Sequence, residues 1–207
     1  MNGIIMNNLI HLKKNKWYFI TLFFACVFVV PILAPIKSSF IFVMNMIVFN
    51  GMIIIIRYSE SWDRYFLTMP ISRDDITISK YISGFIMNLY GLIMIAGNIL
   101  FINALSGKQL ETSDIKLIFS TVIYLFLAQG ITFPLFIKYG FRKNDSVYFG
   151  WAIYILPFIA SNRRLLGFDK VLKYMVKLTN PISIILIVIM MVISINLSKK
   201  IMAKNEF

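Results

Sequence analysis

The sequence predicts an all-α, polytopic membrane protein with six transmembrane helices, and three observations carry that prediction. Of the 207 residues, 59% are hydrophobic and 14% are charged. The mean hydropathy is +0.79, far above the balance of a soluble domain. Six apolar runs contain no Asp, Glu, Lys or Arg, and a helix of about 20 such residues crosses a bilayer. The runs cover residues 17–34, 38–56, 82–105, 117–137, 146–160 and 181–197.

Several classes of function are disfavoured by what the chain lacks. Six spans occupy most of the length, so we expect one membrane domain, residues 1–207, without a soluble catalytic domain. Cys26 and His11 are the only residues of their types, so we expect no disulfide, no metal centre and no catalytic residues. The absence of a P-loop motif predicts that ATP and magnesium bind another subunit. Charge-free spans argue against ion-coupled transport. We also expect no nucleic-acid partner.

The first element is an amphipathic helix expected over residues 1–16. Its apolar side comprises Ile5, Leu9 and Leu12, and three lysines precede the first apolar run. The long leader and the five later runs favour a retained first span over a cleaved signal peptide.

A second amphipathic helix is expected over residues 59–70, between the second and third runs. Pro70 ends it, while Asp63 lies off its apolar face. Such a face is typical of helices on the bilayer surface. Together with residues 1–16, it would alternatively form a docking surface for a soluble partner. The face comprises Trp62, Tyr65, Phe66 and Met69.

The third span begins with a helix-capping motif. Ser72 is followed three residues later by Asp75, the serine-x-x-acid pattern of a capping box. The helix is expected to continue into residues 82–105, where small and polar residues form one stripe. Helix packing is favoured over the lining of a translocation path for this stripe. It comprises Tyr81, Gly84, Asn88, Gly91, Ile95 and Asn98.

The loop before the last span is predicted to hold a basic amphipathic helix over residues 168–179. The distribution of Lys and Arg weakly favours a multi-pass protein of the cell membrane with both termini in the cytoplasm. A re-entrant fifth run would fit the charge distribution better and would move this helix to the inner face.

The region from Glu60 through LTMPISR (67–73) to SKY (79–81) resembles the signature of permease subunits of ABC-2 type exporters. Similar permeases carry a short helix outside before the last span, which favours an outer position for residues 168–179. Within the family, the chain most resembles small permeases of Gram-positive bacteria, including those of the staphylococcal exporter of phenol-soluble modulins.

The resemblance implies that residues 59–70 are a coupling helix seated in an ABC ATPase subunit and that residues 1–16 are an interface helix. It implies a homodimer or a heterodimer with a related permease, in contact with membrane lipid. The implied cargo is hydrophobic or amphipathic, with cytolytic or antimicrobial peptides as candidates. The alternative function is a membrane sensor or assembly factor whose cytoplasmic helices bind a regulator. The implied coupling residues are Glu60, Trp62, Asp63, Tyr65, Phe66, Met69, Pro70, Ser72 and Arg73.

Overall fold

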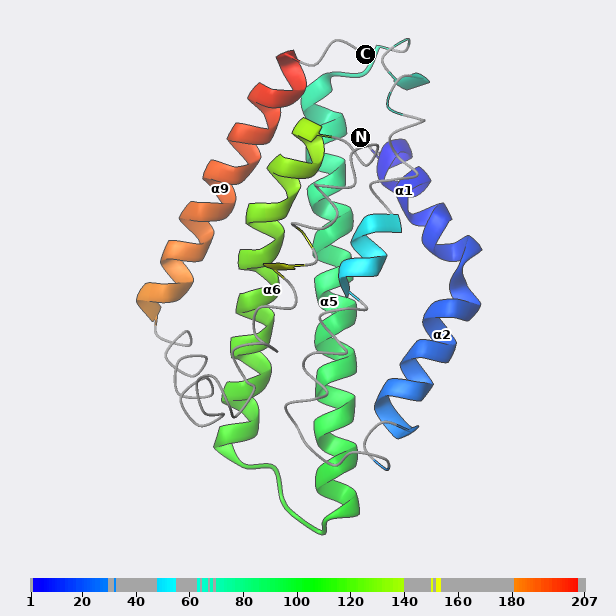
Figure 1. The fold of residues 1–207 in the computed structure, drawn as a ribbon, viewed down its shortest axis with the longest axis vertical. Coiled ribbons are helices and arrows are strands. Elements are labelled where there is room, and N and C mark those ends of the chain that lie inside the picture. The colour runs from blue at the N-terminus through cyan, green and yellow to red at the C-terminus, as the bar shows by residue number, and fades with distance from the viewer. Residues whose placement is uncertain are drawn as a thin grey trace.

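The fold is seen in a computed structural model (Figure 1). It describes residues 2–29, 32, 48–54, 63, 65–66, 68, 70–139, 150, 152–153 and 181–204. Its helices, in chain order, are α1 (Asn2–Lys14), α2 (Lys16–Phe24), the π-helix η1 (Ala25–Val29), α5 (Arg73–Leu105), α6 (Thr112–Tyr139) and α9 (Pro181–Lys204).

The described part of the chain is all-α and contains no strand, as the sequence predicted. Among the described residues, three helices are long and apolar enough to cross a membrane: Arg73–Leu105, Thr112–Tyr139 and Ile184–Lys204. They correspond to the predicted third, fourth and sixth spans. The second and fifth runs lie mostly outside the described residues, and the predicted helix over residues 168–179 lies wholly outside them.

Helices α5 and α6 form the centre of the bundle and run in opposite directions (Figure 1). A short connection, which includes Gly107 at φ 62°, joins them. Helix α9 lies on one side of this pair, and α1 and α2 lie on the other. The start of α1 and the end of α9 are at the same end of the bundle, next to the start of α5 (Figure 1).

The first predicted span is not one regular α-helix. Helix α1 ends at Lys14, α2 starts at Lys16, and the helix then widens into the π-helix η1. A π-helix pairs each carbonyl with the N–H five residues on. For the Cys26 carbonyl that residue is Pro31, which has no N–H. A proline at that position cannot supply this hydrogen bond.

The apolar surface is divided between a core and a face suited to lipid. The main core cluster includes Ile4 of α1, Phe49, Phe133 of α6 and Met202 of α9. Helix α9 also carries many large apolar side chains that are about half or more exposed, from Ile184 to Leu197. A helix that is apolar on all sides belongs in the bilayer, where lipid tails solvate such a face.

Candidate functional site

The start of α5 has the capped geometry that the sequence predicted. Ser72 is the N-cap residue, and its hydroxyl oxygen accepts a hydrogen bond from the Asp75 N–H at 3.1 Å. The same hydroxyl donates to a carboxylate oxygen of Asp75 at 2.8 Å. Asp74 and Asp75 lie in the first turn, where acidic side chains favour the positive end of the helix dipole. The polypeptide therefore enters α5 through a fixed turn.

A buried ion pair links the preceding segment to α5. The Lys80 ammonium donates to the Asp63 carboxylate, and the two residues are 5% and 2% exposed. The sequence interpretation placed Asp63 off the apolar face of this segment, and it did not predict that Asp63 is buried. The charge is tolerated there because Lys80 compensates it. Lys80 follows 17 residues later, so the local helical period could not reveal the pair.

The two described aromatic residues of the predicted coupling face differ in exposure. Phe66 is 9% exposed and belongs to the main core cluster, whereas Tyr65 is 51% exposed. Thr68 and Pro70 are also exposed. The described part of this segment therefore has an inner side fixed in the protein and an outer side open to a partner. The remaining predicted residues, Glu60, Trp62 and Met69, lie outside the described residues.

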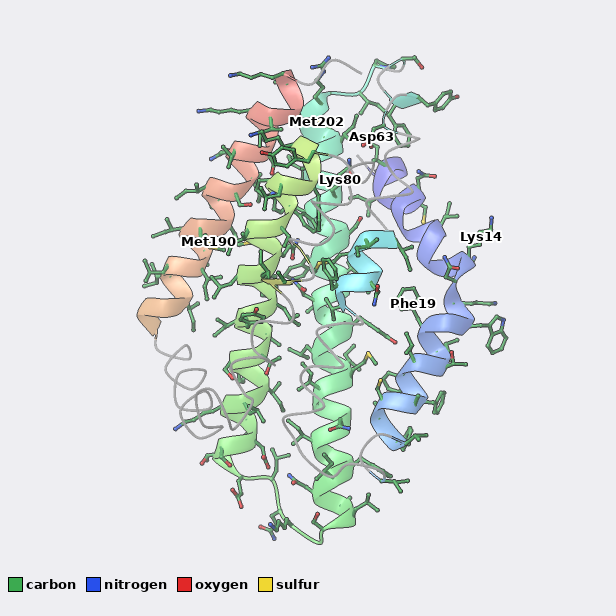
Figure 2. The ribbon with its side chains drawn as sticks, viewed as in Figure 1. Lys14, Phe19, Asp63, Lys80, Met190 and Met202 are labelled. Atoms are coloured by element: carbon green, nitrogen blue, oxygen red, sulfur yellow. The ribbon has the colours of Figure 1, made fainter. Side chains whose placement is uncertain are left out.

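Arg73, predicted as a coupling residue, reaches the last turn of α9. Its Nη1 atom donates to the carbonyl oxygens of Met202 at 3.2 Å and Ala203 at 2.6 Å. Asp74 pairs with Lys199 at 3.2 Å, and this pair is partly exposed. Figure 2 shows Asp63, Lys80 and Met202 at the same end of the bundle. The segment before α5, the start of α5 and the end of α9 therefore meet at one junction.

The glycines of the α5 stripe allow close helix packing. A Cβ atom at Gly84 would lie 2.5 Å from Gln129 Nε2 and 2.6 Å from Phe133 Cζ. At Gly91 it would lie 2.6 Å from Val48 Cγ2. Small residues at such positions let neighbouring backbones approach within a membrane.

The asparagines of the stripe make hydrogen bonds between helices. Asn88 Nδ2 donates to Gln129 Oε1 at 2.6 Å, and Gln129 Nε2 donates to the Tyr81 carbonyl at 3.2 Å. Asn98 Nδ2 donates to the Cys26 carbonyl at 3.0 Å. All six residues of the predicted stripe are buried, including Gly84, Asn88, Gly91 and Asn98.

Three residues of the polar network were not singled out from the sequence. The Tyr81 hydroxyl lies 2.5 Å from Ser194 Oγ and 2.9 Å from Ser198 Oγ, and Ser194 donates to the Gly130 carbonyl at 2.6 Å. The third is Gln129. A glutamine inside the fourth apolar run, and two serines four residues apart at the end of the sixth run, are the signals that could have identified them.

The fold and the junction define a class of protein: an α-helical membrane protein whose spans connect directly to a surface-exposed segment. Among the described residues, no group of three or more His, Cys, Asp or Glu side chains is placed to hold a metal ion.

The family model described as "ABC-2 family transporter protein" matches residues 3–203. The chain therefore belongs to the ABC-2 family of transporter proteins and is a permease subunit of an ABC transporter. Membership implies a partner ABC ATPase subunit. Comparison with curated proteins and with solved structures gave no match.

Proposed function

We propose that this permease exports a hydrophobic or amphipathic substrate, using ATP that is hydrolysed with magnesium on the separate ATPase subunit. Cytolytic or antimicrobial peptides are the proposed cargo, in keeping with the sequence resemblance to exporters of phenol-soluble modulins. The chain is proposed to work as a dimer, with itself or with a related permease. Residues 59–70 serve as the coupling helix, and α1 is the interface helix beside it.

One observation supports this proposal most directly: the segment around Tyr65 is fixed on one side and open on the other. Asp63 and Phe66 are held in the protein, while the aromatic ring of Tyr65 is half exposed. An aromatic side chain presented from a fixed backbone suits a pocket on a partner, because such anchors dominate many interfaces. The adjoining capped start of α5 provides a stiff connection from that pocket to a membrane helix.

The experiment is a pull-down of the ATPase subunit by the permease and its Tyr65→Ala variant. We expect affinity to fall about tenfold or more, because loss of an interface anchor costs about 2 kcal/mol. Trp17→Ala is the matched control, since Trp17 is an aromatic residue 69% exposed in α2. Equal retention by all three proteins would contradict the docking role. Failure of wild type to retain any ABC ATPase would favour a sensor or assembly factor.

Both termini are proposed to lie in the cytoplasm, beside the docked ATPase. The start of α1 and the end of α9 lie at the same end of the bundle, which supports a common side for both (Figure 1). In a Cys26→Ala background, Lys173→Cys and Lys204→Cys are each treated in intact cells with a membrane-impermeant thiol reagent. We expect label at position 173 and none at 204. The reverse pattern would place residues 168–179 inside, against cytoplasmic lipid or the ATPase.

A further inference from the structure

The end of α9 is completed by a side chain from another helix. The last four carbonyls of an α-helix have no partner within the helix. In α9, two carbonyls near that end, of Met202 and Ala203, accept hydrogen bonds from Arg73. The guanidinium is planar and always charged, so it also complements the negative end of the helix dipole. Arg73 therefore acts as a cap for a helix about 130 residues away.

A second contact joins the same two helix ends. Asp74 in the first turn of α5 pairs with Lys199 of α9. The pair is partly exposed, so its contribution to stability is small. Its arrangement is nevertheless consistent with the dipoles, because the acidic partner lies at a helix N-terminus and the basic partner near a C-terminus. Both contacts attach the last turns of α9 to the first turn of α5.

The same region of α5 also holds the segment proposed to dock the ATPase. Asp63 is paired with Lys80, two turns into α5, and Phe66 shares the core cluster with Met202. Figure 2 shows Asp63, Lys80 and Met202 at this end of the bundle. The docking segment and α9 are therefore both attached to the start of α5.

We propose that Arg73 is a positioning residue that fixes the end of α9 to the start of α5. A displacement of the segment around Asp63 and Phe66 is then passed to both α5 and α9, which move together at this end. This inference rests on the proposed function, in which the ATPase moves that segment. It gives Arg73 a role inside the permease, whereas the sequence resemblance suggested a role at the ATPase surface.

The first test uses the full chain alone in lipid nanodiscs. Spin labels are placed at Leu89→Cys in α5 and Lys200→Cys in α9, two exposed positions outside the docking segment, with Cys26→Ala removing the native thiol. The distance distribution between the labels is measured by pulsed electron paramagnetic resonance. In Arg73→Gln it should broaden about twofold, because the last turn of α9 loses its cap and frays.

Two further variants make this test decisive. Lys204→Gln removes one positive charge from the same end of α9 and should keep the wild-type width. Arg73→Lys keeps the charge but loses the planar fork, so its width should be intermediate. A wild-type width in both Arg73 variants would overturn the proposal. If Arg73→Gln does not fold, a wild-type width in Arg73→Lys would overturn it alone.

The second test adds the ABC ATPase that copurifies with the permease. Arg73→Gln should still retain the ATPase in a pull-down. With ATP and vanadate, the distance between labels 89 and 200 should stay constant in wild type, because α5 and α9 move together, and should shift in Arg73→Gln. Loss of ATPase binding in Arg73→Gln, with an unchanged distribution in the free chain, would assign Arg73 to docking and overturn the proposal. If wild type binds no ATPase, the proposed function fails, and the free-chain measurement still decides whether Arg73 holds α9.

Discussion

Helix α9 and the first-span helices α2 and η1 both flank the central pair, but different chemistry holds each of them. On the α9 side, the helix contributes side chains to the contacts with Tyr81, whereas the Arg73 contacts at its end go to backbone carbonyls. Ser194 and Ser198 share the Tyr81 hydroxyl, and Ser194 also bonds the Gly130 carbonyl of α6. Each contact with Tyr81 therefore depends on side chains from both helices.

On the first-span side, two hydrogen bonds from α5 end on backbone carbonyls. The Tyr90 hydroxyl donates to the Phe19 carbonyl at 2.8 Å, and Asn98 donates to the Cys26 carbonyl. The Phe19 and Tyr90 rings also pack edge to face, with centroids 6.0 Å apart. In these two hydrogen bonds, α5 supplies the side chains and the first span supplies carbonyls.

The difference predicts how each flank responds to substitution. A contact between two side chains is lost when either residue changes. A contact to a carbonyl survives a change of the acceptor residue, provided that its backbone stays in place. Each α9 contact with Tyr81 thus depends on two side chains, one from each helix. Each of the two first-span contacts depends on one side chain, which belongs to α5.

The largest effect is expected at α5 itself, which both flanks share. Lys80→Met removes the ammonium that pairs with the buried Asp63 carboxylate, and breaking a buried ion pair typically costs about 3–5 kcal/mol. The midpoint of thermal unfolding in detergent should fall accordingly. Asp63→Leu added to Lys80→Met should recover most of the loss, because no charge is then buried.

The partly exposed pair between Asp74 and Lys199 is the control for this prediction. Lys199→Met should cost less than about 1 kcal/mol, because solvent screens an exposed pair. Equal losses for Lys80→Met and Lys199→Met would show that burial does not distinguish the two pairs.

An intermediate effect is expected on the α9 flank. Tyr81→Phe and Ser198→Ala each remove the hydrogen bond between these two side chains. A double-mutant cycle on thermal stability should therefore give a coupling energy of about 1 kcal/mol, typical of interhelical hydrogen bonds in membranes. A coupling energy near zero would show that the side chains of α9 are no more coupled to α5 than those of the first span.

The sequence predicted features that depend on local pattern. The all-α class and three of the long apolar helices follow from hydropathy alone. The cap at Ser72 depends on a residue three positions away, so a short motif identifies it. The α5 stripe was found because small and polar residues recur on one face of a helix.

The contacts that the sequence did not predict join residues distant in the chain. Arg73 and the end of α9 are 129 and 130 residues apart, and no periodicity relates them. The burial of Asp63 was not predicted, because a helical wheel considers one helix only. In the structure, Asp63 pairs with Lys80, which lies in α5, beyond Pro70 in the sequence.

The smallest effect is expected on the first-span flank. There, a coupling energy near zero would distinguish contacts to a carbonyl from the contacts between two side chains on the α9 flank. Asn98→Ala should cost about 1 kcal/mol, because the Cys26 carbonyl loses a donor inside the membrane. Part of that cost is offset, since Asn98 Oδ1 is buried and has no hydrogen-bond partner in the described part of the chain.

Cys26→Ala should cost little more than the lost sulfur packing, because the carbonyl remains. The coupling energy of the Asn98–Cys26 cycle should therefore be close to zero, in contrast to that of Tyr81 and Ser198. A coupling of about 1 kcal/mol would mean that the Cys26 side chain fixes the backbone of η1, and the contrast between the flanks would then fail.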